Sequence, residues 1–367
     1  MNTSPPSPPP CAIRLLAGAP GALAVAILLW GVVVLCMACV PSSAARAPDA
    51  ARAFDERELA VAPDPARDEP GLDATLTLPR SDPSDAEAPA RRPPVVVLVP
   101  GSTPRDRDET VGPNKPFCDL AWGLAARGIA VLRYQRHRAA GAAQPEAERA
   151  DATLDQEAVN DALAAVRAAR GLGEIDSRRI VVLGHSLGGT AVPRIARRDA
   201  QVAGFVVMAG ATRPLEDVLL GQLRYVAELD GTVSEREHAV LDKLAAEVAR
   251  VKTLTADSAL APSELPLGHP VAYWLDLQAK PARELLRDER RPFLVLHAAR
   301  DYQVTADDLR GWRQALAADP RASYREYPAL NHLFMAGEGP STPSEYTQPG
   351  HVAAEVIGDI ADWVWQL

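Results

Sequence analysis

Five segments of the chain are almost continuously apolar and rich in β-branched residues, and helical patterns separate them. The five are 95–99, 129–132, 180–183, 205–208 and 293–296. A strand that is covered on both faces of a parallel sheet has this composition, because neither face meets water. Helical patterns occupy 117–126 and 155–170, and the second places apolar residues at i, i+3, i+4 and i+7. The alternation predicts a doubly wound α/β domain.

Three further strands are predicted outside this set. Residues 57–61 form a short extended segment, and 72–78 alternate apolar and polar residues with a period of two. That alternation is typical of a half-exposed strand. A terminal strand is predicted at 323–327. Together with the five buried strands, these segments predict an eight-stranded, mostly parallel sheet.

Residues 213–290 interrupt the alternation, because no buried-strand pattern occurs there. A helical apolar stripe is instead formed by Leu241, Leu244, Val248 and Val251. A helical insertion between two sheet strands, on the side where the strands end, is placed to cover a site at that edge. We therefore expect 213–290 to be an all-helical cap, and 51–212 with 291–367 to form the α/β core.

Residues 1–50 differ in character from the rest, and we expect a signal peptide or an N-terminal membrane anchor followed by a linker. Every residue from 22 to 40 is apolar or glycine, a run just long enough to cross a bilayer. Small residues at 43–45 offer a cleavage point, and Cys39 lies in a loose lipoprotein-like box. A cleaved signal, a lipidated Cys39 and an uncleaved anchor all stay open. Each implies export, to a periplasmic or a membrane-attached location.

Composition and charge narrow the expected partners. The chain of 367 residues carries a net charge of −9, and nothing concentrates positive charge for a nucleic acid. Three of the four cysteines lie in the leader, so only Cys118 remains in the body and no disulfide is expected there. Phosphate-loop and metal-ligand spacings are absent from the sequence. We expect a small-molecule substrate, no cofactor and no metal.

The candidate nucleophile is Ser186. It lies in Gly-His-Ser-Leu-Gly between the apolar segment 180–183 and a helical pattern. This G-x-S-x-G arrangement lifts a serine hydroxyl above a parallel sheet on a very tight turn. Side chains at Gly184 and Gly188 would collide with neighbouring backbone, and the serine itself must adopt a strained conformation.

A serine hydroxyl needs a base, and the base needs an acid that fixes its tautomer. In this architecture the acid and then the histidine follow the serine along the chain. His332 alone follows a terminal strand through a short loop, so it is the candidate base. Asp301 is the first carboxylate after 293–296 and is the candidate acid. Its alternative role, in a turn or as a helix N-cap, fits Asp307 better.

Backbone N–H groups must stabilise the developing oxyanion. The amide of Leu187 follows the serine, and the second donor is expected in the loop 100–104, where we favour Ser102 and keep Thr103 as a close alternative. In the predicted cap, Tyr273 and Trp274 either line a substrate pocket or belong to the helical core.

Several motifs carry a resemblance to a known family. They are GSTPRDRDET (101–110), GPNKP (112–116), DLAWGL (119–124), GIAVLRY (128–134), GHSLGG (184–189), RDYQVT (300–305) and LNHLF (330–334). Covering nearly all of 55–365, they resemble bacterial α/β-hydrolases described as dienelactone-hydrolase-like or serine-aminopeptidase-like, a group with carboxylesterases. The resemblance implies an α/β-hydrolase fold, ester hydrolysis without a cofactor, and Ser186, Asp301 and His332 as the catalytic triad.

Two positions depart from the usual family pattern. Pro100-Gly101 stands where His-Gly is usual, and Gln135 stands where many members have Asp. Neither change removes a catalytic group, but we expect both to affect the shape of the pocket. We expect an exported serine carboxylesterase. A peptidase acting at small N-terminal residues and an acyl thioesterase would keep the same triad. A membrane-tethered binding protein on an inactive fold is the third alternative.

Overall fold

The computed structural model describes residues 53–64, 66, 70–80, 92–102, 106–137, 152–317 and 319–367. The expected leader at 1–50 and the alternative oxyanion donor Thr103 lie outside the described residues, so export stays a prediction. Within the described residues, no helix combines the length and the apolar character that crossing a membrane requires.

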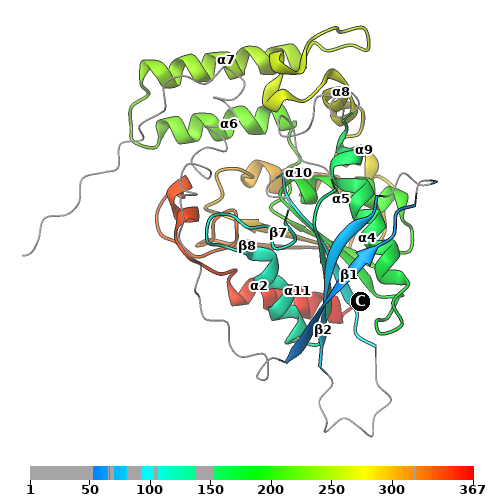
Figure 1. Cartoon of the computed structure of the whole chain (residues 1–367). Helices are drawn as coiled ribbons and strands as arrows, with labels where there is room; N and C mark the ends of the chain where they lie inside the picture. The colour runs from blue at the N-terminus through cyan, green and yellow to red at the C-terminus, as the bar shows by residue number, and fades with distance from the viewer. Residues whose placement is uncertain are drawn as a thin grey trace, which may run out of the picture.

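An eight-stranded sheet forms the centre of the molecule, in the order β1-β2-β4-β3-β5-β6-β7-β8 (Figure 1). The strands are β1 (Phe54–Val61), β2 (Leu72–Pro79), β3 (Val95–Val99), β4 (Ala130–Tyr134), β5 (Ile180–His185), β6 (Gly204–Met208), β7 (Phe293–Ala298) and β8 (Ala322–Tyr327). β2 runs antiparallel to both β1 and β4, and the other neighbouring pairs are parallel. The predicted eight-stranded α/β architecture is confirmed.

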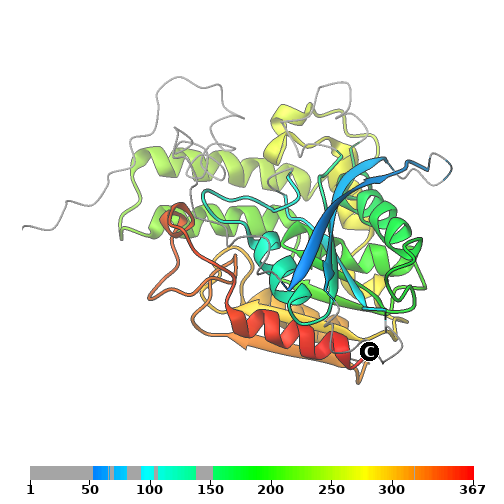
Figure 2. The same cartoon turned by 60° about the horizontal axis from the view of Figure 1, so that its bottom comes forward.

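Helices cover both faces of the sheet. One face carries α4 (Asn160–Arg170), α5 (Leu187–Arg198) and α10 (Ala306–Ala315), whose apolar residues share one core cluster with inward-facing strand residues. The other face carries α2 (Pro116–Ala125) and α11 (Ala354–Trp365), which lie side by side (Figures 1 and 2). Each strand of the centre is therefore buried on both faces, as its unbroken apolar sequence predicts.

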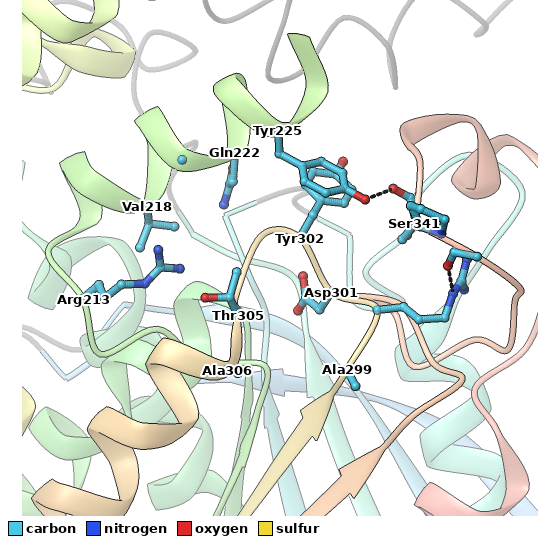
Figure 3. A pocket seen from close by; sticks show the side chains of 14 residues that line it. Arg213, Val218, Gln222, Tyr225, Ala299, Asp301, Tyr302, Thr305, Ala306 and Ser341 are labelled. Carbon is cyan, nitrogen blue, oxygen red and sulfur yellow. Dashed lines mark hydrogen bonds between the residues drawn. The ribbon is translucent and has the colours of Figure 1, made fainter. Parts of the chain in front are cut away.

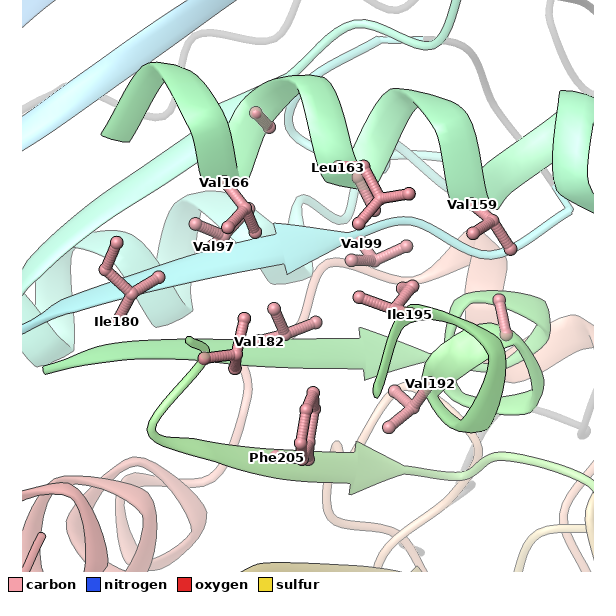
Figure 4. Close-up of a cluster of buried hydrophobic side chains, with 14 of the residues drawn as sticks. Val97, Val99, Val159, Leu163, Val166, Ile180, Val182, Val192, Ile195 and Phe205 are labelled. Atoms are coloured by element: carbon pink, nitrogen blue, oxygen red, sulfur yellow. The ribbon is translucent and has the colours of Figure 1, made fainter. Parts of the chain in front are cut away.

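Figure 4 shows how α4 and α5 pack on the central strands. Leu163 and Val166 of α4, and Val159 directly before this helix, face Val97 and Val99 of β3. The two strand valines are fully buried. Burying a valine or leucine side chain contributes about 1.5–3 kcal/mol, so these contacts fix the strands at whose ends the candidate site lies.

The prediction of a half-exposed β2 is wrong. Thr75 and Thr77, on its polar face, are 5% and 0% exposed. Arg107 donates to Thr75 Oγ1 at 2.7 Å, and Arg133 donates to Thr77 Oγ1 at 3.1 Å. The hydroxyls are buried under charged side chains that satisfy them, and a polar pattern along one strand cannot reveal such a cover.

Between β6 and β7 the chain is helical, with α6 (Leu215–Glu228), α7 (Glu235–Val251), α8 (Val271–Ala279) and the short α9 (Ala282–Leu285). We call residues 213–290 the helical insertion. The helical insertion has a small core of its own, and the predicted apolar stripe packs α7 into it. Leu244, Val248 and Val251 of this stripe are buried beside Tyr273 and Trp274. Figure 1 shows α6 and α7 side by side above the sheet.

Candidate functional site

Ser186 lies on the tight turn between β5 and α5, with φ 52° and ψ −119°. This left-handed region is costly for a residue with a side chain, and strained residues of this kind cluster at functional sites. A Cβ on Gly184 would collide with the Gly188 carbonyl, and one on Gly188 would collide with the Val99 carbonyl. The predicted geometry of the turn is confirmed.

We expect Gly188→Ala to lower the free energy of unfolding by about 2 kcal/mol, because backbone atoms cannot rotate away from the new methyl group. Gly358→Ala is the matched control, since a Cβ there meets nothing within 4 Å and α11 is continuous through that position. The control should gain about 0.5–1 kcal/mol from helix propensity. Urea unfolding measures both variants, and a Gly188→Ala protein as stable as the wild type would contradict the close approach.

The structure brings Ser186, His332 and Asp301 together in one hydrogen-bonded row. His332 Nδ1 lies 2.6 Å from Asp301 Oδ2, and His332 Nε2 lies 3.1 Å from Ser186 Oγ. The ionised carboxylate favours a proton on Nδ1, which leaves Nε2 as the acceptor for the serine hydroxyl. Asp301 and His332 are 4% and 5% exposed, so water competes little with these bonds.

Asp301 is held in place by the loop after β7. Its Oδ1 accepts from the amides of Gln303 at 2.7 Å and Val304 at 3.0 Å, which leaves Oδ2 directed at the imidazole. The expectation that Asp307 caps the next helix is wrong. Thr305 is the N-cap of α10, because its side chain accepts from the Asp307 amide and so replaces a missing helical partner.

The histidine that precedes the serine is engaged elsewhere. His185 Nδ1 lies 3.0 Å from Glu109 Oε2, and Nε2 lies 3.0 Å from the His332 carbonyl oxygen. Burial alone would lower the pKa of His185, but the Glu109 carboxylate and the His332 carbonyl raise it above its usual value. His185, held by Glu109, therefore connects the serine turn to the loop that carries His332.

The loop after β3 lies against the serine. A Cβ added to Gly101 would come 3.0 Å from the Cβ of Ser186, so the backbone there passes as close as glycine allows. Ser102 is the next residue. On the other side of the serine, Leu187 is the first residue of α5, whose N–H has no acceptor within the helix. Both expected oxyanion donors thus belong to segments that meet at Ser186.

Sequence reasoning missed the charged side chains that hold this loop. Glu109 Oε1 accepts from the Gly101 amide at 2.5 Å, and Arg136 Nη1 donates to the Gly101 carbonyl at 2.8 Å. Each of these two side chains is 2% exposed. Glu109 lies in the charged run 105–109, a composition that is typical of a solvated loop. No local feature of the sequence therefore predicts its burial.

Tyr273 and Trp274 are 1% and 0% exposed and belong to the core of the helical insertion. The Tyr273 hydroxyl donates to Glu157 Oε2 at 2.8 Å, a contact between the insertion and the α/β core.

A pocket of about 480 Å³ lies beside Asp301, between α6 and the loops after β7 and β8 (Figure 3). Tyr225 of α6 stacks on Tyr302 with ring centroids 4.7 Å apart, and its hydroxyl donates to the Ser341 carbonyl at 2.9 Å. The other side chains in the wall include Arg213, Val218 and Gln222, which come from the insertion. The insertion thus forms part of the wall next to the acid of the row.

Among the described residues, no group of three or more His, Cys, Asp or Glu side chains is arranged to hold a metal ion. A family model described as "Serine aminopeptidase, S33" matches residues 115–338, a stretch that contains Ser186, Asp301 and His332. The chain belongs to this family of α/β-hydrolases.

Similar proteins and solved structures are consistent with membership in this hydrolase family. The chain is 36% identical over 314 residues to Esterase EstD of Thermotoga maritima, a match that covers 85% of this chain and 68% of the relative. An esterase of Pyrococcus furiosus matches with a TM-score of 0.53 at 14% identity, over 89% of this chain and 96% of that one. Est1E from Butyrivibrio proteoclasticus gives 0.51 at 16% identity, over 84% and 99%. The two solved structures confirm the α/β-hydrolase fold.

Proposed function

We propose that this chain hydrolyses carboxylic esters through an acyl-enzyme formed on Ser186. The observation that carries the proposal is the hydrogen-bonded row from Ser186 Oγ through His332 to Asp301, with the serine on a strained turn. A hydroxyl aligned with a neutral imidazole nitrogen can lose its proton as it attacks a carbonyl carbon.

In the first half of the reaction, Ser186 Oγ attacks the ester carbonyl while His332 Nε2 takes the hydroxyl proton. The negative charge that develops on the carbonyl oxygen is stabilised by the N–H groups of Leu187 and Ser102. The imidazolium, whose positive charge Asp301 stabilises, then gives its proton to the departing alkoxide. An alcohol leaves, and the acyl group stays on Ser186.

In the second half, water takes the place of the alcohol. His332 Nε2 removes a proton from the water as its oxygen attacks the acyl carbonyl, and the same two amides stabilise the second oxyanion. The proton then returns to Ser186 Oγ as the carbon–oxygen bond breaks, which releases the carboxylic acid and restores the free serine. The protein supplies every proton acceptor and donor that these steps use.

The nature of the scissile bond is tested by direct comparison. The name of the 36% identical relative favours esters, whereas the family description names an aminopeptidase. We expect kcat/KM on p-nitrophenyl esters of graded chain length to exceed that on matched acyl thioesters and aminoacyl p-nitroanilides by at least about 100-fold, roughly 3 kcal/mol of transition-state discrimination. A higher value on the anilides or thioesters would replace ester hydrolysis with peptidase or thioesterase activity. No turnover of any class would indicate a binding protein.

A further inference from the structure

We propose that Arg136 is a positioning residue for the oxyanion donor Ser102, and that Glu157 and Tyr273 connect it to the helical insertion. This inference rests on the proposed function, because it concerns the amide that would stabilise the oxyanion. It assigns Tyr273 to a buried hydrogen-bonded chain rather than to a substrate-contacting surface.

One peptide group links Gly101 to the oxyanion donor Ser102. The carbonyl of Gly101 and the N–H of Ser102 belong to the same planar unit and point in opposite directions in a trans peptide. Arg136 Nη1 donates to that carbonyl oxygen at 2.8 Å and therefore sets the direction of the Ser102 N–H. A cation bonded to the carbonyl also polarises the peptide, which strengthens the N–H as a donor.

Glycine makes such a constraint necessary. Gly101 has no Cβ to limit its backbone rotation, and none fits because Ser186 lies so close. Its own N–H is bound by Glu109 Oε1 at 2.5 Å. Glu109 thus fixes the peptide before Gly101, and Arg136 fixes the peptide after it. The peptide after Gly101 carries the Ser102 N–H, the expected oxyanion donor.

Arg136 is itself held in place by Glu157. Its Nη2 donates to Glu157 Oε1 at 2.7 Å, and both side chains of the pair are 2% exposed. Burial alone would raise the pKa of Glu157, but the Arg136 charge holds it below the usual value, so the carboxylate stays ionised. A guanidinium paired and bonded in this way has one orientation, because leaving either charge unpaired in the interior costs several kcal/mol.

Glu157 is in turn bonded to the helical insertion. Glu157 lies in a single π-helical turn, η5 (Asp155–Val159), which directly precedes α4, and π turns often occur at functional sites. Glu157 Oε2 accepts the hydroxyl of Tyr273 at 2.8 Å, and the ring of Tyr273 stacks on His269 with centroids 3.8 Å apart. Asp155, in the same turn, binds Lys280 at 3.1 Å. The insertion is therefore bonded to the turn that holds Arg136.

The test removes the polar chain as a unit, so that neither Arg136 nor Glu157 is left in the interior without the other. In Arg136→Met/Glu157→Met/Tyr273→Phe we expect kcat on a p-nitrophenyl ester to fall about 100-fold, the loss typical of a weakened oxyanion donor. KM should stay within about threefold, because the donor acts on the transition state and not on the bound ester. The Ki of a trifluoromethyl ketone, which forms an oxyanion on Ser186, should rise by the same factor as kcat falls.

Arg291→Met/Glu289→Met is the matched control. This pair is also largely buried, and Arg291 also donates to backbone carbonyls, those of Ala196 and Asp199 near the far end of α5. The control should keep kcat within about threefold of the wild type. The proposal is overturned if a folded triple variant keeps the wild-type kcat, if its loss lies in KM alone, or if the control loses kcat equally.

Tyr273→Phe tests the link to the insertion and removes a single oxygen atom, so it tests the proposal even where the triple variant does not fold. We expect kcat to fall three- to tenfold at an unchanged KM, and a wild-type kcat would overturn the link. The melting temperature should fall by only a few degrees, because the buried Glu157 carboxylate loses one hydrogen bond and keeps its ion pair with Arg136. Failure of the proposed function would look different: either the wild-type protein would not hydrolyse the ester, or a Ser186→Ala protein would keep its ester turnover, whatever happens at Arg136.

Discussion

Replacing Ser186 with alanine should lower kcat on p-nitrophenyl esters by about a million-fold, the loss that follows removal of a triad nucleophile. The hydroxyl is the atom 3.1 Å from His332 Nε2, and nothing else in the row can form the acyl bond. Loss of the nucleophile removes both halves of the reaction at once, so substrate binding alone remains.

The same variant should fold normally. Alanine occupies the space of serine without its oxygen and meets the same backbone penalty at φ 52°. We expect its free energy of unfolding to stay within about 1 kcal/mol of the wild type, since a lost hydroxyl hydrogen bond costs little more. A folded Ser186→Ala protein that retains more than a trace of turnover would contradict the assignment of the nucleophile.

Asp301→Asn should lower kcat by about ten-thousand-fold while the fold is preserved. The reason lies in the two backbone amides, of Gln303 and Val304, that donate to Oδ1. An asparagine must turn its carbonyl oxygen toward those donors, so its NH₂ group faces His332 Nδ1. The imidazole then accepts at Nδ1 and carries its proton on Nε2, where it cannot take the proton of Ser186.

Asp307→Asn is the control for this charge change. Asp307 lies six residues further along the same segment, is exposed, and forms an ion pair with Arg310 on the surface of α10. We expect its kcat to match the wild type, because exposed ion pairs contribute little. Steady-state kinetics measure kcat for both variants. An Asp301→Asn enzyme within tenfold of the wild-type kcat would exclude Asp301 as the acid of the triad.

The sheet and the row of three side chains follow from local sequence patterns. A strand buried on both faces must be apolar throughout, so the sequence alone predicts β3, β5, β6 and β7. The ends of parallel strands meet at one edge, which is why Ser186, Asp301 and His332 can be placed together from their positions after β5, β7 and β8. These inferences need only the order of elements and the residue types.

The supporting charges do not follow from local patterns. Arg136, Glu157 and Glu109 are buried because partners from distant segments satisfy them, and an isolated charged residue in a sequence reads as surface. The prediction of a half-exposed β2 is wrong for the same reason, since Arg107 and Arg133 cover Thr75 and Thr77. Pairings between segments far apart in the chain decide which polar residues lie inside.

Labelling with a fluorophosphonate, followed by peptide mass spectrometry, shows whether Ser186 is a nucleophile activated by His332. We expect one adduct, on the Oγ of Ser186, with none in Ser186→Ala and labelling at least about 1,000-fold slower in His332→Gln, which lacks the base. A protein that forms no adduct, that carries it on another residue, or that labels equally fast without His332 would contradict the proposed triad.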